Sequence, residues 1–303
     1  MENPVKGLRY RQVDVFAARP TGEGAPAGES APASGNGLAV FWDCPRLSRA
    51  TMQQLAVELR QFESAFVMPT SQPARFGIKV FTMEEELDFA GHPLMGAAAV
   101  LHEKHGTARQ ERWALQTNTV LVELETVAAD GGFLVTMDQP APQFVHTLEE
   151  SRAPEVARWI GLAPGDLAPG LPLEVVSTGL PYLIVPVRTN LSHARIAVDD
   201  LEDRLREVSA KFLYVYDVAT SEGRTWDNRG LVEDIATGSA AGPVAAYLCR
   251  RGTLAVGQEL TIHQGAYVGR PSVITARVVG TAPAYSGVRV SGRVNMVASG
   301  VFD

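Results

Sequence analysis

Two stretches of small residues, half a chain apart, constrain the fold more than any other feature. Residues 88–106 and 234–252 align without a gap at an offset of 146 positions, the distance from Asp88 to Asp234. Five of the nineteen aligned positions are identical, which is modest by itself because Ala and Gly are abundant. The offset adds weight, since about half of 303 residues is what an internal duplication produces. The sequence therefore predicts two similar halves.

Each aligned stretch contains a predicted helix, at 93–104 and at 240–250, that is apolar or small on all sides. A helix of that kind must be enclosed by other structure. Alternating or continuous apolar runs predict strands around them, and shorter helices are predicted after Ser48 and near 156–162. The predicted strands are 11–17, 37–42, 62–67, 76–82, 113–126, 132–138, 183–188 and most of 272–301. We expect an α+β protein whose halves each wrap strands around one central helix.

The composition narrows the function. The net charge of -7 argues against a general nucleic-acid surface, which needs a basic face. No apolar run approaches the ~20 residues of a membrane-spanning helix, and two cysteines are too few for a disulfide framework. We expect a cytoplasmic protein without a membrane or nucleic-acid partner. The segment 21–34, rich in Gly, Pro, Ala and Ser, predicts a mobile loop, either a tolerated insertion or a lid.

The starts of the two central helices are candidate anion sites. His92 precedes Pro93, which suits the first helical position, and Thr237, Gly238 and Ser239 precede the second helix. Free backbone N–H groups and the positive end of the helix dipole favour an anion there, such as a substrate carboxylate. The alternative is that Thr237 and Ser239 only cap their helix, and the two readings are about equally supported.

Candidate acids and bases are fewer. Glu63 stands in an apolar strand pattern, on the face opposite Phe62 and Ser64. If that face is buried, its carboxylate is a candidate general base, but an exposed polar face is the commoner arrangement. Asp234 is either a catalytic group or a cap.

The other histidines and the two cysteines are weaker candidates for catalysis or metal binding. The histidines show no metal spacing, and His102 and His105, three residues apart on a helix, lack a third ligand and are interpreted as surface residues. We expect no metal site. Cys44 and Cys249 would suit a two-thiol racemase, but Cys249 falls late in its helix, away from the N-terminal turn that stabilises a thiolate. Phosphate-loop, dinucleotide, nucleophile-elbow and zinc-protease motifs do not occur, so we expect a reaction without a cofactor.

The chain resembles the PhzF family of phenazine-biosynthesis isomerases, which have the diaminopimelate epimerase fold. The resemblance runs nearly end to end. The matching blocks are Val13-Asp-Val-Phe16, Gly35-Asn36, Leu38-Ala-Val40, Glu63-Ser-Ala-Phe-Val67, Phe89-Ala-Gly-His-Pro93, Ser177-Thr-Gly-Leu-Pro181, Glu233-Asp-Ile-Ala-Thr-Gly-Ser-Ala240 and Gly269-Arg-Pro-Ser272. The resemblance implies two barrel-like domains, which we place at 1–125, joined by the tail 288–303, and at 126–287, with the active site between them.

The resemblance also assigns roles. It implies that Glu63 moves a proton on an unsaturated ring or chain while His92, Asp234 and Ser239 position the substrate and assist the transfer. Gly91, Thr237, Gly238 and Asn36 are expected to bind the substrate. The implied enzyme is a homodimeric, cofactor-free isomerase that shifts a double bond in a small cyclic carboxylate of secondary metabolism, as in antibiotic biosynthesis.

Several positions depart from the family pattern. Arg60-Gln-Phe62 stands before Glu63 where Asn-Leu-Ser is usual, and Ile235, Asp88 and Gly37 each replace a proline. The four implied catalytic positions survive while their surroundings change, which favours the same proton chemistry on a different substrate. A dihydro-hydroxyanthranilate and a 4-substituted pyrroline carboxylate both remain candidates. The alternatives are a metabolite-binding protein without catalysis and a two-base amino-acid epimerase.

Overall fold

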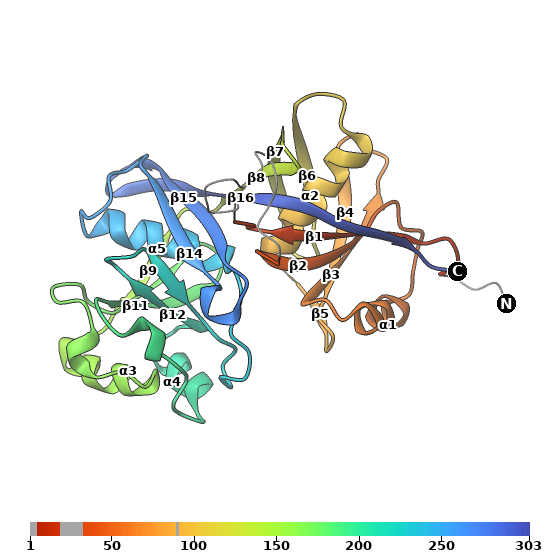
Figure 1. Cartoon of the computed structure of the whole chain (residues 1–303). Coiled ribbons are helices and arrows are strands. Elements are labelled where there is room, and N and C mark those ends of the chain that lie inside the picture. The colour runs from red at the N-terminus through yellow and green to blue at the C-terminus, as the bar shows by residue number, and fades with distance from the viewer. Residues whose placement is uncertain (1–4, 19–32, 89–90) are drawn as a thin grey trace, which may run out of the picture. The chain divides into compact units, whose positions relative to one another are not determined.

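The structure, a computed structural model, describes residues 5–18, 33–88 and 91–303 (Figure 1). The predicted loop at 21–34 lies outside these residues except for its last two positions, as do Phe89 and Ala90 before the first central helix. The chain divides into two compact units. Unit 1 comprises Met1–Asp138 and Ser291–Asp303, and unit 2 comprises Gln139–Val290.

Unit 1 is a closed barrel of eight strands around one helix. Neighbouring strands follow the order β1, β2, β3, β4, β6, β7, β8, β16, and β16 pairs with β1 to complete the ring. The elements are β1 (Arg9–Val15), β2 (Asn36–Phe41), α1 (Arg49–Leu59), β3 (Glu63–Pro69), β4 (Arg75–Phe81), β5 (Glu86–Leu87), α2 (Gly91–His105), β6 (Gln110–Gln116), β7 (Leu121–Ala129), β8 (Gly132–Gln139) and the second part of β16 (Ala284–Val301).

Helix α2 is the core of unit 1. It contacts β1, β2, β3, β6 and β7, and all of its residues from Gly91 to His102 are buried. Gly96 permits this packing, because a Cβ atom there would lie 2.4 Å from Cδ2 of Leu38 and 3.1 Å from Cγ2 of Val13. Helix α2 therefore lacks a polar stripe because other structure encloses it on every side, as the sequence predicts.

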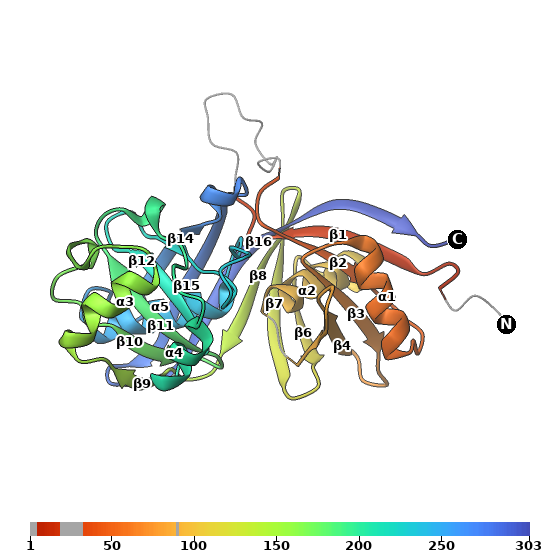
Figure 2. The same cartoon turned by 90° about the horizontal axis from the view of Figure 1, so that it is seen from below.

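Helix α1 lies outside the barrel (Figure 2). Ser48 caps it as predicted, with the N–H of Thr51 donating to Ser48 Oγ. Met52 and Leu55 from α1 pack with Phe66 of β3 in a separate apolar cluster. The side chain of Phe66 thus belongs to the outer face of β3, which leaves the alternate residues of that strand for the interior.

Unit 2 is built from the elements β9 (Gln143–Thr147), α3 (Ala153–Trp159), β10 (Glu174–Ser177), β11 (Pro181–Val187), α4 (Leu201–Glu207), β12 (Phe212–Asp217), β13 (Glu222–Arg224), α5 (Gly238–Arg250), β14 (Glu259–Gln264), β15 (Ser272–Thr281) and the first part of β16. Its strands follow the order β16, β15, β14, β13, β12, β11, β10, β9. Helix α5 packs on β10, β11 and β15, while Trp159 of α3 and Leu205 of α4 join the cluster on the other face. Figure 2 shows α3 and α4 on the outside of these strands.

The two units repeat one sequence of strand pairings. In unit 1, β1–β2 is antiparallel, β2–β3 parallel across α1, β3–β4 antiparallel and β4–β6 parallel across α2. In unit 2, β10–β11, β11–β12 across α4, β12–β13 and β13–β14 across α5 have the same four orientations. Gly242 matches Gly96, since a Cβ atom there would lie 2.0 Å from Oε1 of Gln139. The predicted α+β class and duplication are confirmed.

Two predictions from sequence are wrong. The run 113–126 is not one strand, because Thr117 Oγ1 accepts the N–H groups of Thr119 and Val120 and makes a turn between β6 and β7. His102 is not a surface residue, since it is buried with Nδ1 2.7 Å from Thr126 Oγ1. Within the described ranges, the helices are too short or too polar to cross a membrane.

Candidate functional site

Glu63 and His92 meet inside unit 1. Oε2 of Glu63, the first residue of β3, lies 3.4 Å from Nε2 of His92 in the first turn of α2. Both residues are buried, with 7% of Glu63 and 8% of His92 exposed. The sequence did not decide whether the face of β3 that carries Glu63 is buried or exposed. It is an interior face, and it carries a carboxyl group next to an imidazole.

Strand register explains why Glu63 points inward. β2 and β3 are parallel, and Leu38, whose side chain reaches α2 at Gly96, pairs with Glu63. Because side chains alternate along a strand, Glu63 shares the inner face while Ser64 and Phe66 take the other. Glu63 begins its strand, and its side chain lies beside the first turn of α2.

Burial keeps His92 uncharged. Desolvation lowers the pKa of His92 from 6.5 to about 3. At neutral pH the imidazole of His92 is thus uncharged, and it can donate one N–H and accept one hydrogen bond beside the Glu63 carboxyl group. The Phe62 ring lies 6.3 Å from the His92 ring and flanks it. A carboxyl group and a neutral hydrogen-bonding group, both buried, suit proton transfer at a weakly acidic C–H.

The other two predicted residues of unit 1 lie at the starts of their elements. Asn36 is the first residue of β2, fully buried, and on the inner face with Leu38. Gly91 is the first residue of α2, so the helix begins one residue before His92 and places it inside the first turn rather than at the cap.

In unit 2 the predicted residues gather where α5 begins. Thr237 is the N-cap residue, but its side chain does not cap the helix. Its Oγ1 donates instead to Oδ2 of Asp234 at 2.6 Å. Within the part of the chain that the structure describes, the N–H groups of Gly238 and Ser239 have no acceptor. The helix therefore presents two free donors at its positive end, which suits an anion.

Gln264, which sequence reasoning missed, holds this arrangement together. Its Nε2 donates to the Thr237 hydroxyl and to the Asp234 carbonyl, while its Oε1 accepts the Thr237 N–H and the Tyr214 hydroxyl. Gln264 is 1% exposed, and all of its hydrogen-bonding groups are used. No local motif marks it, because its partners are 27 to 50 residues away.

Ser239 also has a partner that the motif did not indicate. Its Oγ lies 2.7 Å from the hydroxyl of Tyr182 on β11. The offset of the repeat could have found this residue, since Tyr182 stands 146 positions after Asn36. The strand register agrees with this offset. Ile184 stands 146 positions after Leu38, and it pairs with Tyr214 on the parallel strand β12 as Leu38 pairs with Glu63 on the parallel strand β3.

A buried ion pair fixes the loop that carries Asp234. Arg224 binds both carboxylate oxygens of Glu233 at 2.9 and 2.6 Å. Its other nitrogen donates to three backbone carbonyls at 191–194, and the rings of Trp226 and Tyr267 flank the guanidinium. The bidentate geometry orients Glu233 and hence its neighbour Asp234.

The cysteines are poorly suited to catalysis. Both are buried, and burial raises the pKa of Cys44 to about 12 and raises that of Cys249 as well. A thiol of that kind holds its proton at neutral pH. Among the described residues, no three His, Cys, Asp or Glu side chains gather in a way that would hold a metal ion.

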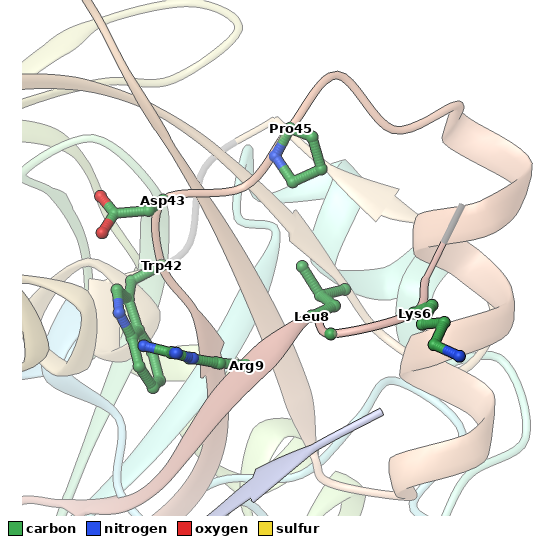
Figure 3. A pocket seen from close by; sticks show the side chains of 7 residues that line it. Lys6, Leu8, Arg9, Trp42, Asp43 and Pro45 are labelled. Carbon is green, nitrogen blue, oxygen red and sulfur yellow. The ribbon is translucent and has the colours of Figure 1, made fainter. Parts of the chain in front are cut away.

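Two surface hollows lie away from the predicted residues. One of about 370 Å³ in unit 1 is formed by residues before and at the start of β1, with Trp42, Asp43 and Pro45 after β2 (Figure 3). Another of about 470 Å³ in unit 2 is lined mainly by residues 148–153 and 164–173. Neither includes a predicted catalytic or binding residue.

Comparisons with known proteins show the family and the fold. The family model of phenazine biosynthesis-like proteins, PhzC-PhzF, matches residues 27–300. A trans-2,3-dihydro-3-hydroxyanthranilate isomerase of Pseudomonas aeruginosa is 33% identical over 96% of this chain and 98% of its own length. A predicted epimerase of Pseudomonas aeruginosa is 46% identical with a TM-score of 0.86, over 97% of this chain and 99% of that one. A PhzF-family protein of Bacillus anthracis has a TM-score of 0.79 at 22% identity, over 98% and 99% of the two chains, and supports the fold.

Proposed function

Because this chain belongs to the PhzC-PhzF family and is an isomerase, we propose that it shifts a double bond in a small unsaturated cyclic carboxylate, with Glu63 carrying the proton. The relatives named as trans-2,3-dihydro-3-hydroxyanthranilate isomerases make a dihydro-hydroxyanthranilate one candidate substrate. A 4-substituted pyrroline carboxylate is the other.

The observation that carries the proposal is the buried carboxyl group of Glu63, 3.4 Å from the neutral His92 ring. Glu63 removes a proton from an activated C–H, and the electron pair of that bond enters the conjugated system. The same carboxyl then returns the proton to a different carbon, so atoms and charge balance without an oxidant or reductant. His92 stabilises the developing charge as a neutral hydrogen-bonding group.

The start of α5 is proposed to bind the substrate carboxylate. Two free backbone N–H groups, at Gly238 and Ser239, and the Ser239 hydroxyl supply three donors at the positive end of a thirteen-residue helix. Donors fixed in advance stabilise an anion without the cost of reorganising water. Asp234, held by Thr237, keeps the loop before the helix in place.

The test is proton NMR in D2O with trans-2,3-dihydro-3-hydroxyanthranilate and with a 4-alkylidene pyrroline carboxylate. We expect one of them to gain deuterium at carbon while its double bond moves. Glu63→Gln should fold normally and lose this activity by about 10³-fold or more, the order that a positioned general base supplies. Glu58→Gln, a matched change at an exposed position of α1, should leave the activity unchanged.

Two outcomes would contradict the proposal. Activity in Glu63→Gln would remove the glutamate from the mechanism. If neither substrate gains deuterium or moves its double bond, although the protein still binds one of them, a metabolite-binding protein is favoured. Independence of a cofactor and the homodimer remain predictions, to be tested by activity after dialysis against chelator and by light scattering.

A further inference from the structure

Ser239 is the most accessible hydroxyl at the start of α5, and it does not stand alone. Its side chain is partly exposed, whereas the Tyr182 hydroxyl that contacts it at 2.7 Å belongs to a residue only 3% exposed. Tyr182 therefore lies behind Ser239. A ligand at the helix start can touch the serine but not the phenol.

The direction of this hydrogen bond follows from chemistry. A phenol is a better donor than an alkyl alcohol, and its oxygen is a poorer acceptor because its lone pair is shared with the ring. Burial raises the pKa of Tyr182 above its ordinary value, so the phenol keeps its proton at working pH. Tyr182 thus donates to Ser239 Oγ, and the serine proton points elsewhere.

Two consequences follow for Ser239. An alcohol that accepts a hydrogen bond becomes a stronger donor, because the two bonds polarise each other. Its rotation about the Cα–Cβ bond is also restricted, so less entropy is lost when it binds a ligand. Both effects strengthen a hydrogen bond from Ser239 to a carboxylate or to charge that develops on it.

We propose that Tyr182 is a positioning residue that orients and polarises the Ser239 hydroxyl toward the carboxylate of the substrate. The inference rests on the proposed function for the identity of that carboxylate. The pairing of Tyr182 with Ser239 is independent of Glu63, since both residues belong to unit 2.

The experiment is a double-mutant cycle of Tyr182→Phe and Ser239→Ala. Tyr182→Phe keeps the ring, which packs 5.6 Å from Phe212, and removes the hydroxyl alone. We expect it to lower turnover of the accepted substrate about tenfold, the loss of one hydrogen bond. In the Ser239→Ala background the same change should have almost no further effect, because the oxygen it acts on is gone.

A matched control is available on the neighbouring strand. The Tyr216 hydroxyl donates to Ser221 Oγ at 3.1 Å, and Tyr216 is 2% exposed, so it forms a second buried Tyr–Ser pair away from α5. Tyr216→Phe should lower stability by a similar amount and leave turnover unchanged. If both Tyr→Phe variants lowered turnover equally, the effect of Tyr182 would be structural.

A second readout does not need turnover. The affinity for 3-hydroxyanthranilate, an aromatic carboxylate of similar size, is measured by calorimetry for the same four proteins of the cycle. If the wild type is inactive but the losses of affinity are coupled in the cycle, the role of Tyr182 is supported and the isomerase proposal is contradicted. If the wild type turns over substrate but the losses are additive, the isomerase proposal is supported and the role of Tyr182 is contradicted.

Should Tyr182→Phe fail to fold, 3-fluorotyrosine at position 182 keeps the shape of the ring and makes its hydroxyl a stronger donor. The proposal expects higher affinity for 3-hydroxyanthranilate, by about twofold or more. Unchanged affinity would overturn it.

Discussion

Thr237 Oγ1 donates a hydrogen bond to Asp234 Oδ2 instead of accepting one from the first turn of α5. A threonine at an N-cap usually satisfies a backbone N–H of its own helix. Here the hydroxyl faces the preceding loop, and the donors of Gly238 and Ser239 stay available. The helix gives up a cap, worth about 1 kcal/mol, and keeps an anion-binding start.

Gln264→Met should damage this region. The change leaves the buried Tyr214 hydroxyl and Thr237 N–H without their acceptor, and unpaired buried groups cost about 1–3 kcal/mol each. We expect a loss of about 2–4 kcal/mol in the free energy of unfolding, measured by urea denaturation, together with weaker carboxylate binding. Gln54→Met, at an exposed position of α1, is the control and should change neither.

Stability should fall on the acid side because of His92. The folded protein holds its pKa at about 3, whereas the unfolded chain has a pKa near 6.5. Between these values the unfolded state binds more protons, so the free energy of unfolding decreases as pH falls below 6.5 and this contribution is complete above it. The slope from one such group approaches 1.4 kcal/mol per pH unit.

His92→Asn should remove that slope from the stability profile between about pH 6 and pH 4. Urea denaturation of both proteins at several pH values measures the difference. Parallel profiles for the two proteins would show that folding does not shift the pKa of His92, and would contradict the desolvated imidazole proposed for catalysis.

Gly132→Ala should weaken the pairing of β8 with β16 in the unit 1 barrel. A Cβ atom at this position would lie 2.1 Å from the carbonyl oxygen of Val294 on β16, which is backbone and cannot move aside without disturbing strand pairing. We expect a loss of about 2–3 kcal/mol in thermal or urea unfolding. Gly165→Ala, where a Cβ atom would meet open space, should be neutral. Equal stability of both variants would argue against this close approach of β8 to β16.

Replacing both cysteines should leave the activity intact. Cys44 and Cys249 are buried thiols whose raised pKa values keep them protonated, so neither can act as a thiolate base. Cys44→Ser with Cys249→Ser is expected to retain turnover within about twofold in the NMR assay. A loss of activity from folded protein would revive the two-base epimerase.

The duplication and its central helices could be predicted from sequence because Gly96 and Gly242 mark close approaches at a fixed offset. The burial of Glu63 could not, since alternation says which residues share a face and not which face is inside. That depends on α2, whose residue His92 contacts Glu63 of β3 although the two are 29 positions apart in the sequence. His102 was open to a better prediction, because a helix enclosed on all sides buries its histidines too.

The partners of the site residues were beyond sequence reasoning for a related cause. Tyr182 and Gln264 carry no motif of their own, and each meets its partner only after distant strands pair. Ser239 and Thr237 were found because they belong to a recognisable block. Their neighbours are determined by tertiary packing, which a local pattern does not record.

Strand β16 gives this protein a particular order of assembly during translation. The strand begins in unit 2 and ends in unit 1, where it pairs with β1 and β8 and closes the barrel. Ribosomes release the chain from its N-terminus, so β1 and β8 keep unpaired edges until residues 291–301 emerge. Exposed edges invite pairing with other chains. The half that is synthesised first is therefore the half that is completed last.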